Sequence, residues 1–296
     1  MQNILIVGSG DVARRILPQL TQRYRVFAVL RDPSRMSEWR TLGAIPILAD
    51  LDDRSSLQRL GGLADYVLHL APPPSAGERD TRTRNLLAAL GRAESLPRRL
   101  IYVSTTGVYG DCLGAVIDET RLVHPESARA QRRVDAETVL RAWGSKHGVQ
   151  VAILRAPGIY ADDRLPVERL KKGLPALSSE DDVYTNHIHA DDLAAACRAA
   201  LRYSGNNRVY NVVDDSDLKM AEYFDRVAAA FDLPPPPRIT RQAAGQMLSP
   251  MQLSFMRESR RIGNLRIKKE LKLRLTYPSV DDGIAEAVSR RKLCLS

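Results

Sequence analysis

The residues that point most directly to a chemical function are Gly8, Gly10 and Ala13, which follow the apolar run Asn3–Val7 and precede a helical pattern. In a strand–turn–helix unit with this spacing, the first glycine permits a tight turn and the second lets the backbone approach a phosphate. The helix start adds unpaired N–H groups and the positive end of its dipole. The pattern predicts a dinucleotide-binding turn, although a glycine-rich turn that binds nothing would look the same. The residues expected to contact the phosphates are Gly8, Ser9, Gly10, Asp11 and Val12.

A second informative point is the end of the next predicted strand, Arg25–Leu30, where Arg31 and Asp32 follow. In such folds an acidic residue here binds the ribose 2′-hydroxyl of NAD, whereas an arginine accommodates the 2′-phosphate of NADP. Arg31, with Arg35 one turn later, favours NADP, because a guanidinium binds phosphate through two N–H groups. Asp32 keeps NAD as the alternative cofactor. The alternative interpretation is that Arg31 only faces solvent at a loop.

Further candidate residues follow the predicted strands Ala44–Ala49, Asp65–Leu70 and Arg99–Ser104. Residues at the carboxyl ends of parallel strands line the ligand crevice of an open α/β sheet. The residues expected to line it are Asp50, Leu51, Ala71, Pro72, Pro73 and Ser104.

The elements that position these residues alternate between strand and helix. Ser34 is expected to cap a short helix that ends at Thr41, and Glu78–Ala93 reads as a helix with one apolar side. This alternation predicts an α/β fold, a doubly wound parallel sheet of the Rossmann type with helices on both faces.

Composition limits the classes of partner. The chain has 296 residues, 44% of them hydrophobic, and a net charge of +9 that favours anionic partners. The basic cluster Arg257–Lys272 is interrupted by apolar residues, so we interpret it as a solvated helix face before a nucleic-acid patch. Cys112, Cys197 and Cys294 lie far apart, which favours a reducing cytoplasm. A strand that begins at residue 3 leaves no room for a signal peptide, and no apolar run is long enough for a membrane span.

The stretch Ser104–Gly110 (STTGVYG) resembles the S-[ST]-x-x-V-Y-G segment of extended short-chain dehydrogenases/reductases, the NAD(P)-dependent epimerase/dehydratase family. Other motifs agree in order along nearly the whole chain. They are Asp118-Glu119 with Pro125, Leu154–Tyr160, Asn186–Leu193, and Ser259–Leu271 with Tyr277-Pro278. The resemblance implies a Rossmann domain of residues 1–161 with 185–213. It also implies a small, mainly helical substrate domain of residues 162–184 with 214–296, and it adds Pro157 and Ile159 to the cofactor contacts.

One departure from the family is chemically important. Family members that do redox chemistry carry Tyr-x-x-x-Lys on the helix after Pro125, with a Glu four residues beyond the Lys. With Glu137 as that Glu, the Lys position is Arg133 and the Tyr position is Arg129, on a helix expected over Pro125–Trp143. None of the ten tyrosines has a Lys four residues later. Arginine stays protonated, so Arg129 cannot serve as the acid/base, whereas Arg133 can still bind the nicotinamide ribose.

The remaining catalytic candidates are two hydroxyl groups. Thr105 occupies the family's third catalytic position, and Tyr109 is either a substitute proton donor or, as we favour, only a wall of the pocket. Two arginines on one helix face repel unless an anion lies between them, which Glu126, Glu137 or a bound phosphate could supply.

Two other groups carry weaker hypotheses. His187 and His189 could be a metal pair, but they lack a third ligand at suitable spacing, so hydrogen-bonded histidines are favoured. Basic residues in the expected small domain could meet an anionic substrate, but solvent-exposed charge is the favoured interpretation. These residues are Lys171, Lys172, Arg238 and Arg241.

Three functions follow from the sequence. The first is an NADP-dependent oxidoreductase or nucleotide-sugar epimerase-like enzyme with unusual acid/base residues, acting on a small molecule that is anionic or nucleotide-linked. The second is a non-catalytic NADP(H)-binding regulator or redox sensor that acts through a protein partner. Nucleic-acid binding rests only on the net charge and is the weakest. No membrane partner is expected, and a homodimer is one alternative for the oligomeric state.

Overall fold

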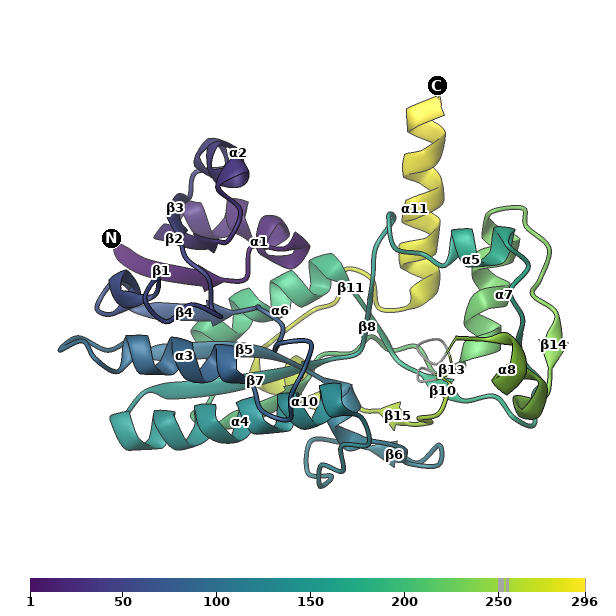
Figure 1. Cartoon of the computed structure of the whole chain (residues 1–296). Helices are drawn as coiled ribbons and strands as arrows, with labels where there is room; N and C mark the ends of the chain where they lie inside the picture. Colours follow the sequence, from purple (N-terminus) through teal and green to yellow (C-terminus); the bar gives the residue numbers. More distant parts are fainter. Residues whose placement is uncertain (250–252, 254–255, 296) are drawn as a thin grey trace.

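The computed structural model describes residues 1–249, 253 and 256–295, and its centre is a seven-stranded sheet in which every neighbouring pair is parallel (Figure 1). The strand order is β12-β7-β5-β4-β1-β2-β3, so the direction of winding reverses between β1 and β4. The strands are β1 (Gln2–Val7), β2 (Tyr24–Leu30), β3 (Ile45–Leu48), β4 (Tyr66–His69), β5 (Arg99–Thr105), β7 (Gln150–Ala156) and β12 (Arg208–Asn211). A reversal of this kind leaves a crevice at the carboxyl ends of the strands.

Helices cover both faces of this sheet. On one face lie α1 (Asp11–Thr21) and α6 (Ala190–Tyr203), and on the other lie α3 (Thr81–Leu90) and α4 (Ala128–His147). Side chains of β1 alternate between the two cores, because successive residues of a strand point to opposite faces. Ile4 and Ile6 join the core with α1, and Leu5 and Val7 join the core with α3. This arrangement confirms the predicted doubly wound α/β fold.

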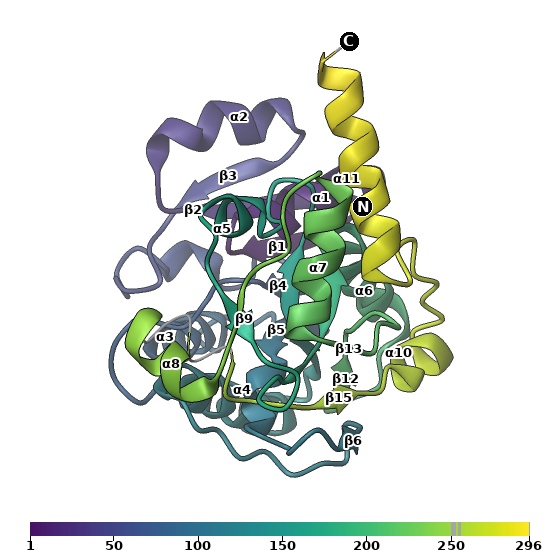
Figure 2. The ribbon, with the colours of Figure 1, turned by 90° about the vertical axis from the view of Figure 1, so that its right-hand side faces the viewer.

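A smaller part of the molecule has its own core beyond the carboxyl ends of the strands. It contains α5 (Val167–Lys171), α7 (Met220–Ala230), α8 (Arg241–Met247) and the start of α11 (Val280–Leu295). Figure 2 looks at this end and shows α7 in front of the sheet. The division into two domains stays a prediction, and residues 250–252, 254–255 and 296 of the expected small domain lie outside the described residues.

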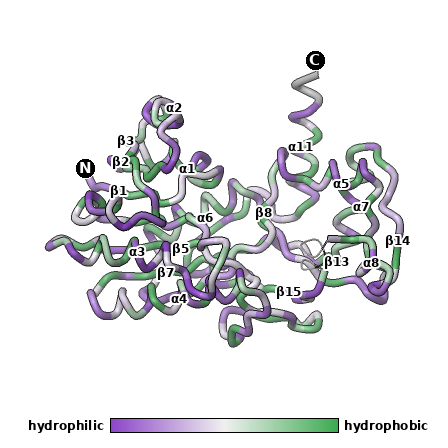
Figure 3. The backbone as a smooth tube through the Cα atoms, in the orientation of Figure 1, coloured by the Kyte–Doolittle hydropathy of each residue, from purple (hydrophilic) through white to green (hydrophobic). Residues whose placement is uncertain are grey.

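Short two-stranded ladders lie outside the central sheet. The ladders pair β8 (Gly158–Tyr160) with β11 (His187–His189), β10 (Tyr184–Thr185) with β13 (Leu218–Lys219), β9 (Ala176–Leu177) with β14 (Arg238–Ile239), and β6 (Val116–Ile117) with β15 (Arg261–Ile262). Further helices of the described residues are α2 (Met36–Thr41) and α10 (Leu265–Glu270). Hydrophilic and hydrophobic segments alternate along the surface helices, α4 among them, because each helix buries only one side (Figure 3).

The starts of three helices differ from those that the sequence suggests, and for α3 and α4 a capping side chain gives the reason. The Ser34 cap is wrong: Asp32 accepts from the Ser34 N–H at 2.9 Å, and a 3-10 turn precedes α2. Helix α3 begins after Asp80, which accepts from Thr83 N at 3.0 Å. Helix α4 begins after Ser127, which accepts from Ala130 N at 3.2 Å. A side-chain acceptor satisfies one of the unpaired N–H groups at a helix start, so the cap decides where the helix begins.

Candidate functional site

The turn after β1 has the shape of an anion site. Gly8 has φ of +104°, and a Cβ there would lie 2.4 Å from the backbone nitrogen of Ala71, so only glycine allows the turn to touch the end of β4. A Cβ at Gly10 would meet nothing within 4 Å among the described residues, so space is open beside the backbone at the start of α1. Ala13, in the first turn of α1, is buried against the β1 side chains Ile4 and Ile6, as expected. A helix start with open space beside it suits a phosphate.

The first cavity extends from this turn to the ends of β2 and β3 and has a volume of about 580 Å³. Eleven residues expected from the sequence line it: Gly8, Ser9, Gly10, Asp11, Val12, Arg31, Arg35, Asp50, Leu51, Ala71 and Pro72. Pro73 does not. Its side chain is buried and its carbonyl accepts from Arg82 Nη1 at 3.5 Å, because the proline loop turns away from the cavity after Pro72.

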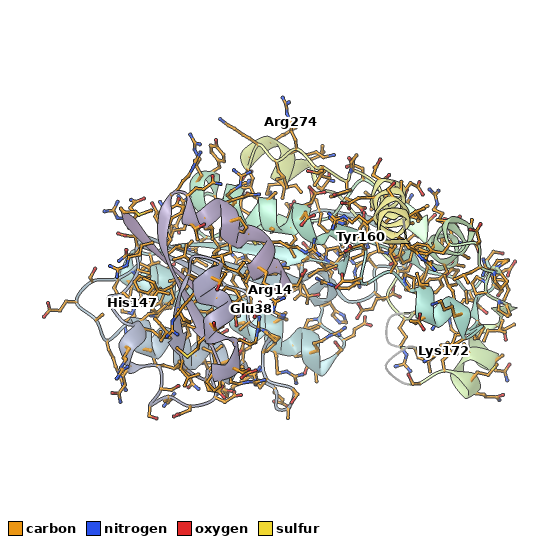
Figure 4. The ribbon with its side chains drawn as sticks, turned by 90° about the horizontal axis from the view of Figure 1, so that it is seen from above. Arg14, Glu38, His147, Tyr160, Lys172 and Arg274 are labelled. Carbon is orange, nitrogen blue, oxygen red and sulfur yellow. The ribbon has the colours of Figure 1, made fainter. Side chains whose placement is uncertain are left out.

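Positive charge gathers where β2 ends. Arg31 is exposed on the cavity wall, and Arg35 donates from Nη1 to the Ser9 carbonyl at 3.0 Å and from Nε to Glu38 at 3.3 Å. Glu38 also pairs with Arg14 on α1, as Figure 4 shows for these two labelled side chains. Arg35 therefore fixes the phosphate turn against the end of β2.

The acidic residue at this point, Asp32, uses one carboxylate oxygen to accept hydrogen bonds from Ser34. Hydrogen bonds from the Ser34 hydroxyl and backbone lower the pKa of Asp32, so it is a carboxylate at neutral pH. Its Oδ1 accepts both hydrogen bonds from Ser34, and Asp32 lines the first cavity beside Arg31.

Sequence reasoning missed two charged residues of the first cavity, Arg82 and Arg164. Arg82 donates to Asp52 from Nε at 2.9 Å and from Nη2 at 2.7 Å, and it donates to the Pro72 carbonyl at 3.3 Å. Arg164 pairs with Asp11. No local motif marks either residue, because each partner carboxylate lies at least 30 positions away in the sequence.

A second, smaller cavity of about 190 Å³ adjoins the first, because Val12 and Leu70 line both. Five residues expected from the sequence line it: Ser104, Thr105, Arg133, Pro157 and Ile159. The two cavities give one path from the end of β2 to the end of β5.

Arg133 reaches the second cavity from α4. Its Nη1 donates to the Val103 carbonyl at 2.7 Å and to the Tyr102 hydroxyl at 3.0 Å, with the guanidinium 5.5 Å from the Tyr102 ring centroid. Tyr102 in turn packs on His69, and burial, followed by the Arg133 charge, lowers the pKa of His69 to about 3. The Arg133 guanidinium therefore contacts neutral groups, and the residue lines the second cavity.

Glu137 does not lie between the two arginines of α4, so this one of the three anions considered is excluded, and Glu126 or a bound phosphate stays a prediction. It accepts from Ser104 Oγ at 2.6 Å and from Arg155 Nε and Nη2 at 3.1 and 2.7 Å, all in the buried interior. Burial by itself would lower the pKa of Arg155, but the Glu137 carboxylate more than offsets it and the pKa is raised. Arg129 is exposed in the first turn of α4 and lines neither cavity.

Tyr109 lines neither of the two cavities, and its hydroxyl donates elsewhere. It is 1% exposed, its hydroxyl donates to Asn211 Oδ1 at 2.8 Å, and the Arg155 guanidinium lies 4.8 Å from its ring centroid. Burial raises the pKa of Tyr109. Both interpretations from the sequence therefore fail geometrically, since buried long-range partners draw this side chain away from the cavities.

Thr105 lines the second cavity, and its hydroxyl can still donate a hydrogen bond there. Its Oγ1 accepts from the Gly107 N–H at 3.2 Å. Glu258, which sequence reasoning missed, lies nearby: a Cβ on Gly107 would be 3.5 Å from Thr105 Oγ1 and 4.0 Å from Glu258 Oε2. Glu258 is held by Arg260 Nη1 at 2.5 Å. Thr105 lines the second cavity, and the Glu258 carboxylate lies on the Gly107 side of Thr105, outside the lining of that cavity.

The two histidines of β11 are buried, and His189 Nδ1 accepts from Asp191 N at 3.3 Å at the start of α6. The described residues contain no group of three or more His, Cys, Asp or Glu side chains arranged to hold a metal ion. Across the same described part of the chain, no helix combines the length and the apolar character that crossing a membrane requires.

The four basic residues of the smaller part are exposed, in agreement with the favoured interpretation of solvent-exposed charge. Lys171 pairs with Glu168, Arg238 with Asp225, and Arg241 donates to the Met256 carbonyl. Figure 4 shows Lys172 in the smaller part, away from Arg14 at the phosphate turn.

Comparisons with known proteins found a matching family and similar proteins. The sequence profile of the NAD dependent epimerase/dehydratase family matches residues 4–212. The chain is 28% identical over 254 residues to GDP-6-deoxy-D-mannose reductase of Pseudomonas aeruginosa, which covers 77% of this chain and 79% of that protein.

Two solved structures extend the similarity over nearly the whole chain. A functionally unknown conserved protein from Silicibacter pomeroyi DSS is 31% identical, with a TM-score of 0.81 over 99% of this chain and 100% of that chain. A short-chain dehydrogenase/reductase superfamily protein from Agrobacterium tumefaciens with bound NAD is 20% identical, with a TM-score of 0.76 over 99% of this chain and 98% of that chain. At that identity the second likeness shows the fold alone.

Proposed function

Because the chain belongs to the NAD-dependent epimerase/dehydratase family, we propose that it binds NADP(H) across the two adjoining cavities. The adenosine and diphosphate lie in the first cavity, and the nicotinamide lies in the second. The observation that carries this proposal is the pair of cavities joined at Val12 and Leu70, with the phosphate turn on their shared wall.

Arginines at the end of β2 support NADP over NAD. Arg31 faces the first cavity, and Arg35 is held beside it by the Ser9 carbonyl. Asp32, the residue that would bind a free 2′-hydroxyl, is partly engaged by Ser34. A 2′-phosphate meets two guanidinium groups here, and a charge-assisted contact of this kind contributes about 1.5 to 3 kcal/mol.

We propose that the protein is an NADP-dependent oxidoreductase or nucleotide-sugar epimerase-like enzyme for a small molecule that is anionic or nucleotide-linked. The bound cofactor supplies hydride exchange. Arg133 binds the nicotinamide ribose, and Thr105 donates a hydrogen bond to a substrate oxygen from the same wall of the second cavity. The buried free thiols of Cys112 and Cys197 support a reducing compartment such as the cytoplasm.

A second candidate function is an NADP(H)-binding regulator or redox sensor without catalysis. The withdrawal of Tyr109 from both cavities favours it, because hydride transfer to a carbonyl also requires a proton donor. Oxidation of NADPH with a panel of nucleotide sugars and carbonyl compounds separates the two. Turnover supports the enzyme, whereas a cofactor-dependent change in partner binding or oligomer size without turnover supports the regulator.

The test of the cofactor proposal is calorimetric titration with NADP⁺ and NAD⁺. Arg31→Asp should weaken NADP⁺ binding about tenfold or more and leave NAD⁺ binding equal or stronger. Arg40→Asp makes the same charge change on α2 outside the cavity lining and should leave the ratio of the two affinities unchanged. If Arg31→Asp behaves like Arg40→Asp, the assignment of the 2′-phosphate site is wrong.

A further inference from the structure

Arg164 lines the first cavity from a segment distant in sequence from the phosphate turn. It lies in the loop between β8 and α5, and it lines the cavity together with the phosphate turn. Its backbone N–H donates to the Ala161 carbonyl at 3.0 Å, which closes a tight turn under it. The side chain is 31% exposed, so it reaches the cavity mouth without being buried in it.

The contact between Arg164 and Asp11 places a cation beside the start of α1. Asp11 is the first residue of that helix, and its carboxylate also accepts from Arg15 Nε at 2.7 Å. A carboxylate at this position would repel the negative charges of a diphosphate. Arg164 offsets that repulsion while it holds the position that the oxygens of a diphosphate would approach.

Arg164 also has donors to spare. A guanidinium carries five N–H donors. Within the described part of the chain, the hydrogen bond of this side chain goes to Asp11, and its other ion pair, to Asp163, has a separation of 3.6 Å. The remaining donors are therefore available to a second anion in the cavity.

We propose that Arg164 is a diphosphate-binding residue, supplied to the cofactor by the loop that leads into the smaller part of the molecule. This inference rests on the proposed binding of NADP(H). The contact joins the cofactor to the smaller core, because the next residue, Leu165, is buried there in one cluster with Leu170 and Phe224. Cofactor binding thereby fixes the beginning of the segment that covers the substrate side.

The chemistry separates this residue from Arg31. A 2′-phosphate is present in both NADP⁺ and 2′-AMP, whereas the diphosphate is present only in NADP⁺. Arg164→Gln should therefore weaken NADP⁺ binding about tenfold or more and change 2′-AMP binding less than twofold, and Arg31→Gln should weaken both. Arg164→Lys keeps the charge and the pairing with Asp11, and it should lose less affinity than Arg164→Gln.

Calorimetric titration of the full chain with both ligands tests the inference, and thermal unfolding verifies that each variant is folded. Lys171→Gln is the control, since Lys171 is an exposed cation of α5 outside the cavity lining. Unchanged NADP⁺ affinity in Arg164→Gln overturns the inference, as does an equal loss for NADP⁺ and 2′-AMP. If the unaltered protein binds neither ligand, the proposed function fails as well, which is a distinct result.

Discussion

Removing the charge of Glu137 should destabilise the fold strongly, because this carboxylate holds three buried donors. Glu137 and Arg155 are each 5% exposed, and Ser104 donates to the same carboxylate. The Glu137→Gln substitution keeps the shape but leaves the Arg155 charge without its counterion. Breaking a buried ion pair in this way costs about 3 to 5 kcal/mol. The Tyr109 ring beside Arg155 retains part of its stabilisation, so we expect a value of about 3 kcal/mol.

Urea unfolding followed by circular dichroism measures this change in the free energy of unfolding. The matched control is Glu168→Gln, the same chemical change in an ion pair with Lys171 where the glutamate is 75% exposed. An exposed pair contributes about 0 to 1 kcal/mol, so the control should stay within that range. If Glu137→Gln costs no more than Glu168→Gln, the buried pair does not hold the end of β5 against α4 as we argue.

Two further substitutions follow from glycine geometry and one from a buried acid. Gly8→Ala should abolish dinucleotide binding and destabilise the fold by about 3 kcal/mol, because its Cβ would lie 2.4 Å from Ala71 N; an unchanged unfolding curve would contradict this. Gly10→Ala should leave stability nearly unchanged while it weakens NADP⁺ binding in a titration, because its Cβ occupies open space in the first cavity. Burial raises the pKa of Asp214 from 3.8 to about 8, so the unfolded chain loses this proton at lower pH than the folded chain does. Stability attributable to this group should therefore fall as pH rises from about 4 to about 8, and Asp214→Asn should flatten that fall in urea titrations across the range; an equal pH slope in both proteins would refute it.

The sheet and most of the residues that line the cavities could be predicted from the sequence, because short local patterns indicate them. The run before Gly8, the spacing to Ala13 and the residues that follow each apolar strand are all read within a few positions. Parallel strands then bring those positions together, which is why residues as distant as Arg31 and Pro157 line adjoining cavities. Their contacts with a cofactor stay a prediction.

The rest depends on partners that are distant in the chain. The hydroxyl of Tyr109 is held by Asn211, 102 positions away, so its withdrawal from the cavities has no local signature. Arg164 lines the first cavity and pairs with Asp11, which lies 153 positions away in the sequence. The predicted helix starts are wrong for a different reason. Several polar residues precede α3, and only the structure shows that Asp80 is the cap.

The most direct test of the cofactor site is a crystal structure of the protein with NADP⁺. The account predicts the 2′-phosphate beside Arg31, the diphosphate at Gly10 and Arg164, and the nicotinamide in the second cavity between Thr105 and Arg133. A dinucleotide bound elsewhere, or cavities without ligand at saturating NADP⁺, would contradict it.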